Sequence, residues 1–282
     1  MQKFSYHTHT SFSDGKCSLE QMLDKAVSLG WEEIGISDHL IIHKNMKSSH
    51  VYEMIVKSNS FNAPHVYRDS FDTSLDVFRR NSEYIRGVAK KYPIKVFIGY
   101  EVDYFTYDGW EDEFKNFIKQ IDYDYLLNGN HFFFDENGDN LIDIYRFDNL
   151  DPILCVDSFE NYISRHYKTI QKAVNSGLFD ILAHLDYARR SVMHKVFPCI
   201  NERLNIVDCL KQSGMGVEIS TKGLRKVDSF YPEDFILKEL VKKNVPIVID
   251  DDAHNVGELG YKFDKAEEKL KELGCCNRYR LK

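Results

Sequence analysis

Short apolar runs alternate with longer amphipathic segments along most of the chain. The short runs are rich in Ile, Val, Leu, Phe or Tyr and are edged by Gly, Asp or Asn, which is typical of buried strands. Seven segments fit this pattern: Phe4–His7, Glu33–Ser37, Lys95–Tyr100, Tyr125–Gly129, Asp180–His184, Gly216–Ser220 and Pro246–Asp250. The pattern therefore predicts seven strands separated by helices.

The helices are predicted from apolar residues at helical spacing. The clearest begins at Ser18, where Gln21 completes a capping box, and ends at Gly30. The others are Leu75–Lys91, Trp110–Gln120, Phe159–Ser176, Ile200–Ser213, Pro232–Lys243 and Lys262–Leu273. Strands that alternate with helices predict a parallel sheet with right-handed crossovers. Closing the sheet gives an α/β fold, a TIM-like (β/α)7 barrel; a doubly wound open sheet is the alternative.

The chain has 282 residues, of which 43% are hydrophobic. This size suits one barrel domain over residues 1–282, and two small domains are the alternative. Two stretches, 41–72 and 135–157, look like loop insertions because they are polar or carry turn residues. Long loops in a compact domain are often functional lids.

Charge and cysteine usage limit the partners and the compartment. The formal net charge is −7, which argues against nucleic-acid binding but not against a small anionic substrate, because bound metal ions can reverse the local charge. We find neither a targeting signal nor a run of about 18 apolar residues that would span a membrane. The six cysteines form no CxxC pair, so we expect a reducing, cytoplasmic location.

Potential metal ligands follow six of the seven predicted strands. They are His7 and His9, His39, Glu101, His131, His184, and Asp252 with His254, and the early Asp14 joins them. The carboxyl ends of barrel strands form the active-site face, so these side chains are expected on one rim. The i, i+2 spacing of His7 and His9, and of Asp252 and His254, places both members of each pair on one face of an extended segment.

A single histidine at a strand end is more often a structural residue than a ligand. We therefore leave five histidines unassigned: His43, His50, His65, His166 and His194. The combination of the other six with carboxylates indicates a metal centre. Imidazole and carboxylate ligands without thiolate suit Zn, Mn or Fe, and their number implies two or three divalent ions. With several ions, a bridging hydroxide could attack phosphorus, and the remaining positive charge would match a phosphomonoester dianion.

Basic residues near the predicted rim could bind phosphate. Arg189 and Arg190 follow the fifth strand, and Lys222 and Arg225 follow the sixth. Guanidinium groups bind phosphate through two hydrogen bonds, although these residues could equally be solvated loop charges. Asp186, two residues after His184, is a candidate ligand, proton carrier or loop cap.

These residues resemble the motifs of the polymerase and histidinol phosphatase (PHP) superfamily, and the resemblance covers nearly the whole chain. The matching motifs are His7-Thr8-His9-Thr10 with Ser13-Asp14-Gly15, Ser37-Asp38-His39, Asn130-His131, Ala183-His184-Leu185-Asp186 and Asp252-Ala253-His254. Within the superfamily the chain is similar to the histidinol-phosphate phosphatase branch. The segments that carry this similarity are 99–104, 180–186 with Arg189-Arg190, and 220–226. Asp14 stands where some members have His.

The resemblance implies a distorted seven-stranded barrel with a trinuclear site. By motif, His7, His9, Glu101 and Asp252 hold the first ion. Glu101 bridges to a second ion held with His131 and His184, and Asp14, His39 and His254 hold the third.

The implied reaction is hydrolysis of L-histidinol phosphate in histidine biosynthesis. The alternatives are a phosphoesterase for a nucleotide or sugar phosphate and, from a different class, a non-catalytic accessory domain. Carboxylates and aromatic residues that could meet the cationic part of histidinol phosphate are Asp69, Asp72, Tyr104, Asp135 and Tyr145.

Overall fold

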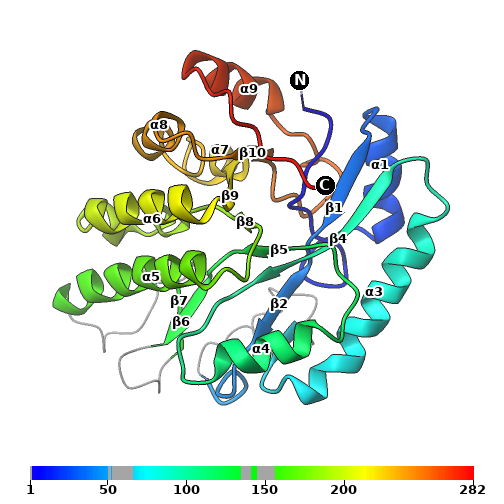
Figure 1. Ribbon diagram of the computed structural model, residues 1–282, viewed down its shortest axis with the longest axis horizontal. Coiled ribbons are helices and arrows are strands. Elements are labelled where there is room, and N and C mark those ends of the chain that lie inside the picture. Colours follow the sequence, from blue (N-terminus) through cyan, green and yellow to red (C-terminus); the bar gives the residue numbers. More distant parts are fainter. Residues whose placement is uncertain (1, 50–51, 53–65, 135–140, 145–155) are drawn as a thin grey trace.

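The fold is a closed barrel of parallel strands surrounded by helices, seen in a computed structural model that describes residues 2–49, 52, 66–134, 141–144 and 156–282 (Figure 1). In this part of the chain six parallel strands follow one another around the barrel, in the order β10-β9-β8-β5-β4-β1. They are β1 (Glu33–Ile36), β4 (Lys95–Val102), β5 (Tyr125–Asn128), β8 (Ile181–Leu182), β9 (Gly216–Ser220) and β10 (Ile247–Asp250). Each lies within or overlaps a strand that the sequence predicts.

The seventh predicted strand, Phe4–His7, is an extended segment rather than a regular strand. Its backbone bonds to β1 and past the end of β10: Gly35 N donates to Ser5 O at 2.8 Å, and His9 N donates to Ala253 O at 2.8 Å. Side chains replace some ladder bonds, since the N–H of Tyr6 donates to Asp250 Oδ1 at 2.6 Å. The segment closes the sheet, and the fold is the distorted TIM-like (β/α)7 barrel that the sequence predicts.

Helices surround the barrel (Figure 1). They are α1 (Leu19–Ser28), α3 (Leu75–Ala89), α4 (Trp110–Ile118), α5 (Val156–Ser176), α6 (Ile200–Ser213), α7 (Lys222–Lys226), α8 (Asp234–Lys242) and α9 (Phe263–Glu272). The predicted capping box at Ser18 and Gln21 is present in both directions. The short α7 was not predicted, because five residues are too few to show a helical period.

Two additional pairs of strands lie at the carboxyl end of the barrel strands. β2 (His39–Ile42) pairs in parallel with β4 and with β3 (Tyr67–Arg68), so this pair extends the barrel sheet, whereas β6 (Phe132–Phe134) and β7 (Leu141–Asp143) form an antiparallel sheet of their own. β2, β3 and β7 overlap the predicted insertions 41–72 and 135–157. Within the described residues these stretches contain strands, which the sequence did not predict, and much of the remainder lies outside the described residues.

The interior of the barrel below the predicted rim is filled by side chains. Tyr125 donates its hydroxyl to the carbonyl of Tyr6 at 2.5 Å. A Cβ at Gly35 or at Gly99 would lie 2.2 Å from the Tyr125 side chain, so only glycine allows this ring to cross the barrel. The surrounding cluster contains Phe4, Tyr6, Phe97, Tyr125, Leu127, Ile181, Ala183 and Val248. This closed floor supports the site above it.

In the described part of the chain, none of the helices combines the length and apolar character that crossing a membrane would require.

Candidate metal centre

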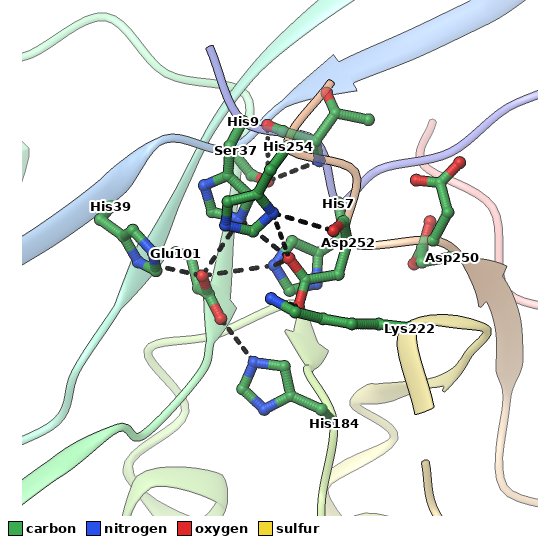
Figure 2. A network of polar contacts seen from close by, with 12 residues as sticks. His7, His9, Ser37, His39, Glu101, His184, Lys222, Asp250, Asp252 and His254 are labelled. Carbon is green, nitrogen blue, oxygen red and sulfur yellow. Dashed lines mark hydrogen bonds and ion pairs between the residues drawn. The ribbon is translucent and has the colours of Figure 1, made fainter. Parts of the chain in front are cut away.

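The nine predicted ligands come together at the carboxyl end of the barrel strands. Figure 2 shows His7, His9, His39, Glu101, His184, Asp252 and His254 of this set. Their candidate ligand atoms form four overlapping groups, each with all atoms within 4.8 Å of one another. The groups are His9 with Asp14, His39 and His254; His7 with His184 and Asp252; His7 with His9 and Glu101; and His39 with Glu101 and His131. The first of these adds His9 to the set that the motif resemblance implied.

Glu101, near the end of β4, lies at the centre of these groups. Its Oε2 is 3.0 Å from His39 Nδ1 and 3.3 Å from His7 Nε2, whereas its Oε1 is 2.8 Å from His184 Nε2. The two oxygens therefore face different histidines, as a carboxylate that bridges two ions would. Gly129 makes room for this carboxylate, because a Cβ there would lie 1.9 Å from Glu101 Oε1.

Several buried ligand atoms in this cluster form no hydrogen bond with the described residues. They are Nε2 of His7, Nε2 of His9, Nδ1 of His39, Oε2 of Glu101, and Oδ1 of both Asp14 and Asp252. Leaving a buried polar atom without a partner costs about 1–3 kcal/mol. Six such atoms converging from nitrogen and oxygen donors fit divalent metal ions, which would satisfy all of them at once.

Buried carboxylates contact two of the histidines at Nδ1, the ring nitrogen on the side away from the cluster. Glu218 Oε2 is 2.8 Å from His7 Nδ1, and Glu218 Oε1 accepts the N–H of His184 at 2.6 Å. Asp103 Oδ2 is 3.2 Å from His131 Nδ1. A carboxylate on the second ring nitrogen fixes the tautomer in which Nε2 can bind a metal. Neither Glu218 nor Asp103 was predicted from the sequence.

The electrostatics of the cluster keep its carboxylates ionised. Burial alone would raise the pKa of Glu101, but the charges of His7, His131 and His39 hold it well below its usual range. Burial opposes ionisation of Asp252 too, and Lys222, whose Nζ is 2.6 Å from Asp252 Oδ2, leads the contacts that hold its pKa well below the usual range. Burial, together with the neighbouring His254 and His39, lowers the pKa of His9 to about 3, so the ring is neutral and able to bind a metal.

Two ligands have backbone conformations that are rare for residues other than glycine. The φ angle is 22° at His184 and 48° at Asp252. Such conformations cost about 1–3 kcal/mol and persist where the surrounding structure enforces them, often at functional sites. Here they turn both side chains into the cluster (Figure 2).

A cavity of about 430 Å³ opens beside the cluster. Four cations that follow β8 and β9 line it: Arg190 after β8, and Lys222, Arg225 and Lys226 of α7. Arg190 and Arg225, both expected at the site from the sequence, therefore lie beside the candidate ligands in this cavity. Arg225 also donates to the carbonyl of Asp251 at 3.1 Å, and Arg190 donates to the hydroxyl of Tyr187 at 2.8 Å.

Asp186 and Arg189, which were also expected at the site, are not among the described residues that line the cavity. Asp186 is fully buried and accepts the backbone N–H of Glu233 at 2.9 Å, so it acts as a loop cap. Arg189 donates to the carbonyl of Phe230 at 2.8 Å and lies 3.3 Å from Asp186. Both residues hold the loop after β8 in place from behind.

The residues expected to meet a cationic substrate group are mostly elsewhere. Asp69 pairs with Lys47 at 2.9 Å, and the buried Tyr104 donates its hydroxyl to Glu111 at 2.6 Å. Neither they nor Asp72 are among the described residues lining the cavity. Asp135 and Tyr145 lie outside the described residues.

Comparison with known families agrees with the motifs. The sequence profile of the PHP domain matches residues 5–222, most of the chain. The chain belongs to the PHP domain family. A histidinol-phosphatase from Bacillus subtilis is 25% identical over 287 residues, covering 95% of this chain and 100% of that protein. A second relative, from Deinococcus radiodurans, is 25% identical over 186 residues, which cover 64% of this chain and 66% of that protein.

Two solved structures share the fold of this PHP chain. The histidinol phosphate phosphatase from Lactococcus lactis, in complex with zinc, L-histidinol and phosphate, has a TM-score of 0.64 and 19% identity, covering 97% of this chain and 94% of that one. A candidate histidinol phosphatase from Listeria monocytogenes has a TM-score of 0.67 and 18% identity, covering 93% and 99%.

Proposed function

We propose that this protein is a metal-dependent phosphomonoesterase that hydrolyses L-histidinol phosphate to L-histidinol and phosphate, in the cytoplasm and as part of histidine biosynthesis. The observation that carries the proposal is that nine candidate ligands lie together beside a cavity lined by cations. The chain also aligns with the whole length of a histidinol-phosphatase. The proposal includes two or three Zn, Mn or Fe ions. They would be held by His7, His9, Asp14, His39, Glu101, His131, His184, Asp252 and His254.

Divalent ions in such a site lower the pKa of water and withdraw charge from phosphoryl oxygens. The chain itself contributes the cations that hold the phosphate. Arg190 and Arg225 offer forked guanidinium donors, and Lys222 lies between the cavity and Asp252. These groups attract a dianion and orient its phosphorus toward the ligand cluster.

Two buried carboxylates hold histidine rings in the orientation that metal binding requires. Glu218 and Asp103 hold Nδ1 of His7 and His131, which leaves the Nε2 atoms directed at the centre of the cluster. The proton for the leaving alkoxide must come from water or from a group that reaches the cavity. Asp186 is buried, accepts the backbone N–H of Glu233 and is not among the described residues that line the cavity.

The test is a comparison of kcat/KM for four monoesters with the Zn-loaded and the Mn-loaded protein. They are histidinol phosphate, serine phosphate, a sugar phosphate and a nucleoside monophosphate. Histidinol phosphate should exceed the others by at least about tenfold, the margin that one good contact provides. A nucleotide or sugar phosphate in first place would contradict the substrate and leave the metal site intact. An absence of chelator-sensitive activity on all four would favour an accessory domain.

A further inference from the structure

The cavity has a second wall that differs in chemistry from the cationic one. Its residues are Ile41, Tyr67, Phe132 and Asp143, so it presents apolar and aromatic surface together with one carboxylate. The cations follow β8 and β9 around the barrel, whereas this wall follows β1 and β5. We call these four residues the distal wall.

The distal wall is built as two cross-strand pairs. Ile41 of β2 is paired with Tyr67 of β3, and Phe132 of β6 is paired with Asp143 of β7. Directly paired residues project from the same face of a sheet, so each pair presents both side chains to the cavity. The rings of Tyr67 and Phe132 meet edge to face, with centroids 6.0 Å apart, and join the two pairs into one surface.

This wall extends past the carboxyl ends of β1 and β5. The barrel strands, β2 and the segments that follow the strands supply the candidate ligands and their orienting carboxylates, and the residues after β8 together with α7 supply the cations. β2 pairs with β4 as well as with β3, whereas β6 and β7 form a sheet of their own, and the distal wall is what these four strands add to the cavity. A part of the cavity that neither binds metal nor carries positive charge is suited to contact the portion of the substrate that leaves.

The acids that line the cavity lie at different places in it. Asp14 belongs to the ligand cluster, and Glu258 accepts the backbone N–H of His254 at 2.8 Å and lies 3.4 Å from Arg225, beside the cations. Asp143 is paired with Phe132 on the distal wall and is 3% exposed. A carboxylate on a wall that also carries two aromatic rings is the combination that recognises an organic cation, through an ion pair and cation–π contact.

We infer that Asp143, with Tyr67 and Phe132, is a specificity-determining residue that selects monoesters whose leaving alcohol carries a positive charge. The inference rests on the proposed function and adds the residue that would distinguish a cationic alcohol from a neutral one. Phosphate is held at the cationic wall, and the ammonium or imidazolium of the alcohol is held at the distal wall. The cavity then attracts the negative phosphate at one end of the substrate and the positive group of the alcohol at the other.

The experiment measures a selectivity ratio, the kcat/KM for ethanolamine phosphate divided by that for ethylene glycol monophosphate. These esters differ only in an ammonium in place of a hydroxyl. Asp143→Asn should lower the ratio at least about tenfold, and Phe132→Leu should lower it in the same direction. Asp264→Asn, at an exposed position on α9, is the matched control and should leave the ratio unchanged.

Thermal unfolding and metal content identify any variant that has simply failed to fold. Asp143→Lys provides a second test, because a reversed charge should favour an anionic alcohol, measured with glycolate phosphate. A ratio that stays at the wild-type value in folded Asp143→Asn and Phe132→Leu overturns the inference, even where histidinol phosphate is the best substrate. A ratio that falls while histidinol phosphate is a poor substrate supports the distal wall and rejects the proposed function.

Discussion

Glu218 and His7 form a fully buried pair, with Glu218 Oε2 2.8 Å from His7 Nδ1. The other oxygen of the same carboxylate accepts a hydrogen bond from the backbone N–H of His184. One side chain on β9 therefore fixes ligands from two other parts of the barrel.

We expect Glu218→Gln to weaken metal binding about ten- to a hundredfold, because an amide presents one acceptor where the carboxylate presents two. Titration of the metal-free protein with zinc in a chelator buffer measures this change. Glu268→Gln, at an exposed position on α9, is the matched control and should bind zinc like the wild type. Equal zinc affinity in both variants would show that Glu218 does not orient the ligands.

Gly129→Ala should impair the site through a steric effect on Glu101. The added Cβ would lie 1.9 Å from Glu101 Oε1, so the carboxylate must move away from the histidines it faces. We expect at least about a hundredfold lower kcat/KM together with reduced metal content, since displacement by about 1 Å is enough for such a loss. Gly87→Ala on α3, where a Cβ meets nothing within 4 Å, should retain activity and be slightly more stable. Full activity in Gly129→Ala would contradict the central position of Glu101.

Metal content is a direct test of the number of ions. Elemental analysis of gently purified protein should find two or three transition-metal equivalents per chain, and a chelator should abolish activity. Glu101→Gln keeps the shape but removes the charge that two groups of ligands share, so it should lose metal as well as most of the rate. His166→Asn, on α5, should keep both. Active wild-type protein with one equivalent or none would contradict a multinuclear centre.

His166 should make the protein sensitive to acid. Neither ring nitrogen has a hydrogen bond with the described residues, and burial lowers the pKa of His166 to about 3. The unfolded chain protonates this ring near pH 6.5, so stability falls as the pH drops from there toward 3. His166→Leu removes the group that takes up this proton on unfolding. Between pH 7 and pH 5 its free energy of unfolding should fall by about 2 kcal/mol less than that of the wild type. Urea unfolding at both pH values measures the difference, and parallel losses in the two proteins would contradict the assignment.

The ligand set could be predicted because barrel topology alone brings the carboxyl ends of strands together. All nine predicted ligands lie in the cluster for this reason. They are far apart in the sequence except within two short segments, 7–14 and 252–254. Glu218 left a weaker signal, an acidic residue inside the apolar strand β9. A charged side chain in a fully buried strand requires a partner, and that requirement could have identified it.

Asp186 shows where the same reasoning fails. Its i, i+2 relation to His184 would place both side chains on one face of an extended segment. The positive φ of His184 breaks the extended geometry, and Asp186 then turns toward Glu233. The strands β2 and β3 were missed for a different reason, because the long polar stretch between them concealed two short pairing segments.

The filled barrel floor has a kinetic consequence. Tyr125 crosses the interior beneath the ligands, so among the described residues the barrel floor is filled and we expect the ester to reach the ligands from the cavity beside them. In the proposed site metal ions and cations hold the phosphate, so we expect the alcohol to depart before it. Release is therefore ordered, and inorganic phosphate should inhibit competitively with the ester whereas the alcohol should inhibit noncompetitively.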